Sequence, residues 1–366
     1  MSDSDQRPEP TVLEIVPTAT ASDAALRAVA RHDEALRAER MPEDPPMNED
    51  SVLAALRHQS ADFSSRHFLL WEGGEVVGKA AVQFPLRQNI HSAFVDLSVL
   101  AARRRQGLAR RLLGAVGTYA SQLGRRKLLT NASSRLPAGE ATLRRLGAEL
   151  TMEQQFIQLV LSELEPGRLA DWMTEARAGA PQYRLWQNQG AYPADRLEAI
   201  ACLHDVMNTL PRGSASRGKR DLEPVPTTPE ALRAEEERLI ASGARRLSTF
   251  VEHAPSGHLV AFTELLWHGD RPTLVFQHAT AVDPQHRRHR LGRWIKAANL
   301  HALPVANPQA KFVRAGNTDD NTGILNINRE LGFRPYATHT DWQMDTEALL
   351  VYLNTVHLET QCIRIE

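Results

Sequence analysis

The sequence carries one pattern twice, and this repeat constrains the fold more than any other feature. Several pairs of equivalent residues are separated by 183 positions (282 − 99 for the second pair): Val77 and Val260, Val99 and Val282, Ala109 and Gly292. Gly147 and Gly332 are 185 positions apart (332 − 147), a drift that one short loop absorbs. Because a shared offset across a hairpin, a strand and a helix start is hard to obtain by chance, we predict two copies of one domain.

Each copy has the pattern of an α/β domain with a mixed sheet. In the first copy, apolar alternation predicts strands at 12–16, 67–71, 75–84, 93–99, 127–131 and 150–161, and helical spacing predicts helices at 22–39, 48–59, 107–123 and 138–146. Ser22 and Asn48 are expected to cap the first two helices. The second copy repeats the order, with strands at 183–187, 247–252, 258–267, 273–282, 312–315 and 336–344, and helices at 193–210, 231–241, 291–303, 321–331 and 346–357.

This pattern sets the expected domain boundaries. A chain of 366 residues is longer than one ordinary domain. We predict a mobile tail at 1–10, a first domain at 11–162, a linker at 163–181 and a second domain at 182–366.

Composition narrows the function classes. A formal net charge of −1 argues against general binding of nucleic acid or membrane surfaces, so a basic patch must be local. The two cysteines, Cys202 and Cys362, form neither a disulfide framework nor a zinc spacing, which fits a reducing cytoplasm. The N-terminus has no secretory pattern, and no apolar run reaches membrane-spanning length.

A dense arginine cluster follows an apolar strand of the first copy. The stretch RRRQGLARR, residues 103–111, comes directly after VDLSVLAA. The first N–H groups of a helix have no partner within it and carry partial positive charge, so a strand-to-helix turn can bind a phosphate. Gly107 would let the anion approach the backbone, and Arg104, Arg105 and Arg110 would add charged contacts. Neither other phosphate-binding glycine motif, G-x-x-x-x-G-K-[ST] or G-x-G-x-x-G, is present.

The run Arg104-Arg105-Gln106-Gly107-Leu108-Ala109 resembles the [QR]-x-x-G-x-[GA] signature of the GNAT superfamily of N-acetyltransferases. The element order of both halves also resembles a GNAT domain. The resemblance implies two GNAT domains in tandem and acetyl-CoA as the acyl donor. It implies that this loop binds the pyrophosphate, and that the preceding strand, with Leu97 and Val99, binds the pantetheine arm and polarises the thioester carbonyl.

The second copy has a related loop, Arg287-Arg288-His289-Arg290-Leu291-Gly292, followed by Arg293. Arg290 replaces the central glycine. By the same resemblance, Thr280 and Val282 would lie on the cofactor strand, and Asn317 and Asn321 near the cofactor. The run INRELGF, residues 327–333, resembles the end of the family's Y-x-x-x-G-F stretch.

Acetyl transfer to an amine requires removal of a proton near neutral pH. Glu264 lies on the strand where some GNAT enzymes carry their base, and it is our candidate base; Ala81 occupies that offset in the first copy. The tyrosine that often assists departure of the thiolate is replaced by Asn328, which can donate a hydrogen bond, and by Leu143 in the first copy. We therefore expect catalysis mainly by positioning and carbonyl polarisation.

Several alternatives stay open at this stage. Glu264 could be an ordinary strand residue, and Asp96 is expected to be structural or to contact substrate. The protein could be a CoA-binding sensor or scaffold without turnover. His278, His286, His289 and His301 do not match a metal-ligand pattern, so no metal is expected. The acceptor could be a primary amine of a small molecule or a peptide, and the protein a monomer or a homodimer.

Overall fold

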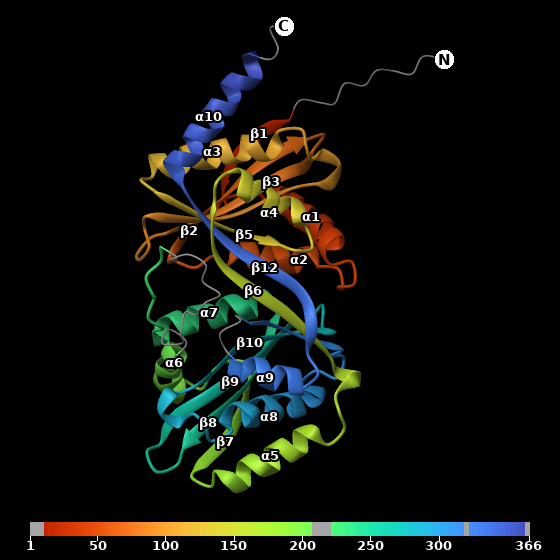
Figure 1. The fold of residues 1–366 in the computed structure, drawn as a ribbon, viewed down its shortest axis with the longest axis vertical. Helices are drawn as coiled ribbons and strands as arrows, with labels where there is room; N and C mark the ends of the chain where they lie inside the picture. The colour runs from red at the N-terminus through yellow and green to blue at the C-terminus, as the bar shows by residue number, and fades with distance from the viewer. Residues whose placement is uncertain (1–10, 207–220, 318–321, 363–366) are drawn as a thin grey trace, which may run out of the picture. The chain divides into compact units, whose positions relative to one another are not determined.

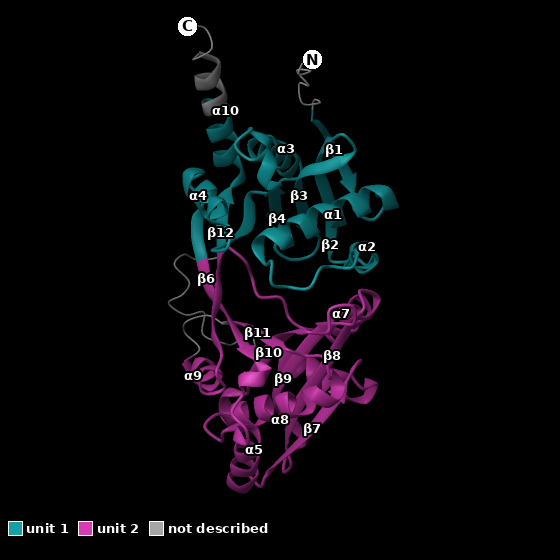
Figure 2. Ribbon diagram, turned by 90° about the vertical axis from the view of Figure 1, so that its right-hand side faces the viewer, with its two compact units in different colours: residues 1–151, 341–366 teal, residues 152–340 magenta. Residues whose placement is uncertain are grey.

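The computed structural model describes residues 11–206, 221–317 and 322–362. The chain forms two compact units (Figures 1 and 2). Unit 1 comprises residues 1–151 and 341–366, and unit 2 comprises residues 152–340. The predicted tail at 1–10 lies outside the described residues.

Unit 1 is a mixed sheet with helices on its faces. Its elements are β1 (Val12–Pro17), α1 (Asp23–Arg40), α2 (Glu49–Arg57), β2 (Phe63–Glu72), β3 (Glu75–Pro85), β4 (Ser92–Val99), the 3-10 turn η1 (Ala101–Arg103), α3 (Leu108–Gln122), β5 (Lys127–Ser133), α4 (Pro137–Arg145), the start of β6 (Glu149–Val160), the end of β12 (Arg334–Asp345) and α10 (Thr346–Cys362). Its first five strands lie in the order β1-β2-β3-β4-β5, antiparallel except for the parallel pair β4 and β5.

Unit 2 repeats this topology. Its elements are the rest of β6, η2 (Leu161–Glu163), α5 (Arg168–Gly179), β7 (Tyr183–Gln189), η3 (Ala194–Arg196), α6 (Leu197–Asp205), α7 (Pro229–Ala241), β8 (Ala244–His253), β9 (His258–His268), β10 (Leu274–Val282), η5 (Pro284–His286), α8 (Leu291–Ala306), β11 (Phe312–Asn317), α9 (Thr322–Glu330) and the first part of β12. Strands β7-β8-β9-β10-β11 lie in that order, and only β10 and β11 are parallel. The predicted repeat and the mixed α/β fold are therefore confirmed.

Local sequence signals place the helix starts. The side chain of Ser22 accepts a hydrogen bond from the Ala25 N–H at 3.2 Å, and Asn48 accepts one from Ser51 at 3.0 Å. Both caps agree with the prediction, because each satisfies an N–H that the helix itself leaves free. The predicted helix at 193–210 starts with a 3-10 turn at Ala194–Arg196 and continues as α6, and residues 207–210 lie outside the described part.

The apolar faces of the two sheets form the cores. In unit 1, residues of β2, β3 and β4 pack with α3 and with Leu349 and Leu353 of α10. In unit 2, α8 is buried on almost every side: Leu291, Leu303 and all residues from Trp294 to Leu300 are buried. Three tryptophans belong to these cores and are at most 4% exposed: Trp267, Trp294 and Trp342.

The units differ from the predicted domains in two respects. The segment predicted as a linker, 163–181, contains helix α5, whose Trp172 is 7% exposed and belongs to a core cluster of unit 2. The segment 341–366, predicted to end the second domain, belongs to unit 1, where α10 packs on α3 (Figure 1). Conversely, 152–162 belongs to unit 2. The boundaries at 162 and 182 are corrected accordingly.

Candidate functional site

The turns before α3 and α8 have the same backbone conformation at the same offset. Arg105 and Gly107 have positive φ angles of 63° and 80°, and their equivalents Arg288 and Arg290 have φ angles of 69° and 58°. The separation is 183 positions in both cases (288 − 105 and 290 − 107). Positive φ is uncommon for residues other than glycine, so its appearance at two arginines of the second turn shows that the turn keeps its shape without the glycine.

This conformation leaves a run of N–H groups without acceptors. Among the described residues, no protein acceptor pairs with the backbone N–H groups of 105–110 in unit 1 or of 287–293 in unit 2. The first helical bonds are those from Arg111 to Gly107 and from Trp294 to Arg290. We call these two turns the loop-1 cradle (104–110) and the loop-2 cradle (287–293). Successive free N–H groups at a helix N-terminus form an anion-binding concavity.

In the loop-1 cradle, most arginine side chains are engaged within unit 1. Arg104 donates through Nε to the Val99 carbonyl at 3.0 Å and forms a bidentate pair with Glu39 at 2.5 and 2.6 Å. Arg110 donates to the Leu353 carbonyl of α10 at 2.6 Å. Arg105 is exposed, and no partner for it occurs in the described part of the chain. Arg105 is therefore the arginine of this turn that is available to an anion.

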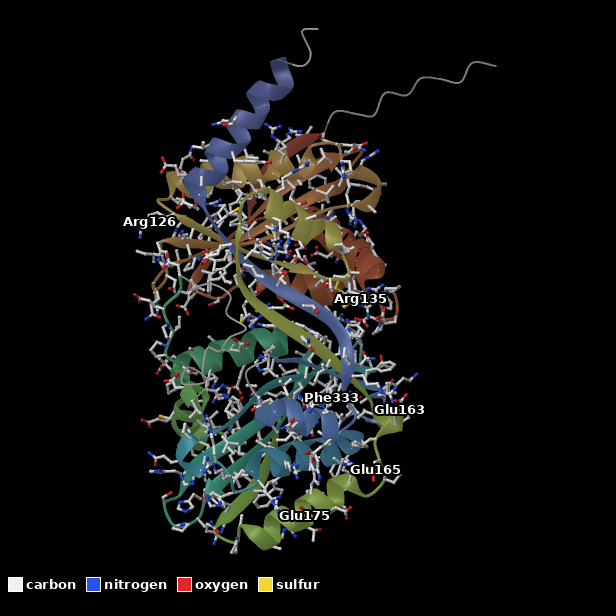
Figure 3. All side chains as sticks on the ribbon, in the orientation of Figure 1. Arg126, Arg135, Glu163, Glu165, Glu175 and Phe333 are labelled. Atoms are coloured by element: carbon white, nitrogen blue, oxygen red, sulfur yellow. The ribbon has the colours of Figure 1, made fainter. Side chains whose placement is uncertain are left out.

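The loop-2 cradle repeats this arrangement. Arg287 donates through Nε to the Val282 carbonyl at 3.3 Å, the counterpart of the Arg104 contact. Arg290 pairs with Glu175 of α5 at 2.9 Å on the surface, and Arg293 pairs with Glu330 of α9 at 2.5 Å. Glu175 is labelled in Figure 3. Arg288, the counterpart of Arg105, is exposed and has no partner among the described residues.

The other residues predicted in the two cradles make contacts within or next to their turns. Leu108 and Leu291 are buried at the starts of their helices, and Gln106 makes only a 3.4 Å contact with the Ala102 carbonyl. The ring of His289 lies 5.5 Å from that of Tyr183. Ala109 and its counterpart Gly292 are small where α8 approaches α9: a Cβ at position 292 would lie 3.3 Å from Ile327.

The parallel strands next to each cradle pair only over part of their length. Strands β4 and β5 pair through Ser92–Phe94, and β10 and β11 pair through Leu274–Gln277. The later parts of β4 and β10 contain the predicted cofactor residues Leu97, Val99, Thr280 and Val282, and no strand within the described ranges pairs with them on that side. Their backbone groups can therefore bind an extended ligand.

The two strands differ in one respect. The β3–β4 register is constant, whereas the β9–β10 register shifts between Gln277 and Thr280. This β-bulge places an extra residue in β10, and bulges often redirect a side chain beside an active site. The side chain of His278, within the bulge, is 55% exposed.

Glu264 lies at the centre of a buried polar cluster in unit 2. Its side chain is only 2% exposed. Tyr192 and Ser248 donate hydroxyl hydrogen bonds to its Oε1, the latter at 2.9 Å. The Nε of Arg246 lies 3.8 Å from the same oxygen, and Nδ1 of His278 lies 3.5 Å from Oε2.

These partners keep the carboxylate ionised. Burial alone would raise the pKa of Glu264, but the contact with His278, the charges of His204 and Arg246, and the Tyr192 hydrogen bond lower it to about 2. The Glu264 contact in turn raises the pKa of His278. A buried carboxylate with such a low pKa is a weak base, which bears on the role predicted for Glu264.

Sequence reasoning missed the cluster around Glu264. His278 was considered only as a metal ligand, and among the described residues no group of three or more His, Cys, Asp or Glu could hold a metal ion. Tyr192 and Arg246 were not singled out. The sequence does predict that Glu264 and His278 lie on neighbouring strands. It does not predict the β10 bulge, which brings the two side chains into contact.

The asparagines predicted near the cofactor are placed only in part. Asn328 lies on α9 and is 1% exposed. Asn317 ends β11, where its backbone pairs with Gln155. Asn321 lies outside the described residues. Asp96 is exposed on β4, with its carboxylate 3.9 Å from Lys79 Nζ.

Comparisons with known proteins agree with this architecture. Residues 33–147 match the sequence model described as the Acetyltransferase (GNAT) family. A tandem GNAT protein from the clavulanic acid biosynthesis pathway, solved without acetyl-CoA, is similar in structure with a TM-score of 0.75 and 23% identity, over 92% of this chain and 99% of that one. A GCN5-related N-acetyltransferase from Sphaerobacter thermophilus is similar with a TM-score of 0.59 and 13% identity, over 91% of this chain and 96% of that one. No curated protein sequence matches the chain.

The fold therefore defines a protein built from two GNAT-type units. Residues 33–147 match the GNAT acetyltransferase family model, and the chain as a whole has the fold of a tandem GNAT protein. The resemblance predicted from the arginine-rich turn is confirmed. No helix within the described ranges is both long and apolar enough to span a bilayer.

Proposed function

We propose that this protein is an acyl-CoA-dependent N-acyltransferase that transfers acetyl from acetyl-CoA to a primary amine of a small molecule or peptide. The observation that carries this proposal is the pair of cradles, each with six or more consecutive free N–H groups, one exposed unpaired arginine and an adjoining unpaired strand edge. A monomer or homodimer in the cytoplasm, without nucleic acid or membrane partners, completes the proposal.

These residues fit acetyl-CoA. The pyrophosphate would be held by the N–H groups of 105–110 or 287–293 together with Arg105 or Arg288. The free edges of β4 and β10 would hold the amide-bearing pantetheine arm. When bound, acetyl-CoA supplies an activated acyl group that an amine can attack directly.

Unit 2 carries the groups for proton removal. Glu264 is too deeply buried and too weak a base to meet the amine, whereas His278 is exposed and lies beside it. We assign proton removal to His278, with Glu264 as the positioning residue that orients its Nδ1. Asn328 would donate a hydrogen bond to the leaving sulfur.

Proton removal in unit 2 can be tested with three variants. His278→Gln is expected to lower turnover about 100-fold or more, the usual contribution of a general base. His268→Gln is the control, because His268 lies on β9 and its Nδ1 contacts the Ser242 carbonyl at 3.2 Å. Unchanged turnover in His278→Gln would remove His278 from this role.

Glu264→Gln separates positioning from chemistry. Glu264 contributes most to the raised pKa of His278, Glu235 raises it further, and burial and Arg246 lower it. Without the Glu264 charge the acid limb of the kcat/KM profile should move to lower pH, because His278 then loses its proton more easily. An unmoved limb with reduced turnover would indicate a purely structural role.

Unit 1 supports a second candidate function, acetyl-CoA binding without turnover. Ala81 occupies the position of Glu264, and the β3–β4 register contains no bulge. Release of free thiol from acetyl-CoA in the presence of a panel of primary amines, measured for the intact chain and for His278→Gln, tests both functions. Residual release in the variant would assign turnover to unit 1 as well.

A further inference from the structure

A small cavity in unit 2 lies beside the polar cluster around Glu264. It has a volume of about 210 Å³ and lies between helix α7 and the first residues of β8. Pockets for drug-sized ligands are roughly 300–1,000 Å³, so this cavity suits a smaller molecule. Its wall combines aliphatic side chains with charged ones, among them Leu239, Ile240, Leu266, Glu236, Arg245 and Arg246.

The cavity and Glu264 share one face of the sheet. Arg246 and Leu266 of the cavity wall pair across β8 and β9, and Glu264 lies two residues from Leu266 on β9. Residues two apart on a strand point to the same face. Leu266 also pairs with Phe276, which precedes His278 by two residues on β10. The cavity therefore adjoins the point where the unpaired part of β10 begins.

Arg246 has unused hydrogen-bond donors in the wall of this cavity. The central carbon of its guanidinium lies 3.4 Å from the centre of the Tyr192 ring, and its Nη2 donates to the Gly190 carbonyl at 3.1 Å and to Glu236. Within the described ranges, neither its buried Nε nor its Nη1 has a hydrogen-bond acceptor. Because buried donors are normally satisfied, free donors beside a cavity indicate a ligand with an acceptor group, such as a carboxylate.

The charges around the cavity also favour an anion. Glu236 is already held by two arginines, Arg246 and Arg233, the latter at 2.6 Å. Arg245 lines the cavity as well, and no partner for it occurs in the described part of the chain. Even with the carboxylate of Glu264 counted, three positive charges face two negative ones. The excess positive charge attracts a negatively charged group.

Unit 1 lacks the arginine of this cavity. Leu266 corresponds to Gln83 of unit 1 (266 − 83 = 183), and the β2 residue that pairs with Gln83 is Ser65. The arginine therefore occurs only in the unit that also carries His278.

We propose that this cavity binds the acceptor of unit 2, and that the acceptor is an α-amino acid with an aliphatic side chain. This proposal rests on the acyltransferase function proposed above and gives its acceptor a chemical class. The carboxylate of the amino acid accepts hydrogen bonds from Arg246, its side chain lies against Leu239 and Leu266, and its amino group points towards His278.

The spacing of the two polar partners suits such a molecule. The Nε of Arg246 lies 3.8 Å from one oxygen of Glu264, and the Nδ1 of His278 lies 3.5 Å from the other. One carboxylate therefore separates them, a span that the carboxylate and amino group of a single amino acid can bridge with a hydrogen bond at each end.

The transfer conserves atoms and charge. The amine nitrogen forms the new C–N bond as the C–S bond breaks, and the sulfur keeps the bonding electron pair and leaves as a thiolate. The proton of the amine passes to His278 and from it to water. The products are the N-acetylamino acid and CoA.

Three matched acceptors test the class. Leucine, leucinamide and 3-methylbutylamine, which is leucine without its carboxylate, share one side chain. With the intact protein, kcat/KM for thiol release from acetyl-CoA should be about 10- to 100-fold higher for leucine than for the other two, the contribution of one charged hydrogen-bonded contact. Leucinamide has the least basic amine of the three, so a preference for leucine over it cannot come from a larger amount of neutral amine.

Two pairs of variants locate the contact. Arg246→Gln should bring the three kcat/KM values together, whereas damage to the fold would lower all three alike and keep their ratio; Arg246→Lys keeps the charge and should retain part of the preference. Leu239→Trp fills the cavity and should raise KM for leucine without weakening acetyl-CoA binding. Glu237→Trp, at an exposed position of the same helix, is the matched control and should leave this KM unchanged.

The outcomes separate this proposal from the one on which it rests. An equal or higher kcat/KM for 3-methylbutylamine than for leucine, or an undiminished preference in Arg246→Gln, would overturn the amino-acid assignment while leaving the acyltransferase function standing. Absence of thiol release with every primary amine tested would overturn the acyltransferase function itself.

Discussion

Glycine 107 provides a quantitative test of the loop-1 cradle. Its φ of 80° is unfavourable for a residue with a side chain, yet a Cβ added there would meet no protein atom within 4 Å. Gly107→Ala therefore introduces backbone strain of about 1–2 kcal/mol without a clash. Alanine also lowers the conformational entropy of the unfolded chain, which offsets part of this strain. The free energy of unfolding should therefore fall by about 1 kcal/mol.

Gly114, seven residues later in α3, is the matched control. It does not have a positive φ, and a Cβ there would make an ordinary contact 4.0 Å from Leu353. Because alanine is the better helix former by about 1 kcal/mol, Gly114→Ala should stabilise the protein. The same glycine-to-alanine substitution should therefore change the free energy of unfolding in opposite directions at the turn and in the helix that follows it.

Calorimetric unfolding of the two variants measures both effects. For a unit of this size, about 1 kcal/mol corresponds to a shift in Tm of about 2–4 °C, downward for Gly107→Ala and upward for Gly114→Ala. A Gly107→Ala variant as stable as wild type would refute the positive φ, and with it the run of free N–H groups at the cradle. Binding of acetyl-CoA should also weaken in this variant, because the added methyl group faces the anion site.

Three further predictions concern stability. Trp172→Ala should destabilise unit 2 by about 3–5 kcal/mol in urea titrations, because this residue is part of a core and not of a flexible linker; an effect below about 1 kcal/mol would restore the linker interpretation. His67 of β2 is 3% exposed, and neither ring nitrogen has a hydrogen-bond partner in the described part of the chain; burial together with the charge of Lys79 lowers its pKa to about 4. Since the folded state resists protonating His67, its contribution to stability is present above pH ~6.5 and is lost as the pH falls towards 4, so His67→Phe should raise Tm and flatten this acid limb; a wild-type slope in the variant would contradict the assignment. Asn48→Ala should cost about 1 kcal/mol by removing the α2 cap, and Asn48→Asp should restore most of it.

The sequence predicted local features of this chain well and non-local ones poorly. The offset of 183 placed Gly107 and Arg290 at equivalent turns, and the structure gives them similar backbone angles because helix starts are set by nearby residues. The α5 helix was missed although Trp172 and Ala176 are four residues apart on one face, since flanking glycines and prolines favoured a linker.

The remaining differences depend on pairing between distant strands. Residues 341–366 follow the second copy in sequence but pack in unit 1, and no local pattern specifies which sheet a final strand joins. The β10 bulge that places His278 beside Glu264 is likewise a property of register with β9. A polar replacement inside the repeat was also hidden: Lys79 of β3 occupies the position that Phe262 has in β9 (262 − 79 = 183).

The most direct test of the central claim is a calorimetric titration of the intact protein with acetyl-CoA, compared with the double variant Arg105→Ala and Arg288→Ala. The two cradles predict saturable heat from binding in both units, and clearly weaker binding in the variant, which loses one charged contact from each cradle. Absence of heat from the wild type at millimolar acetyl-CoA would contradict the account.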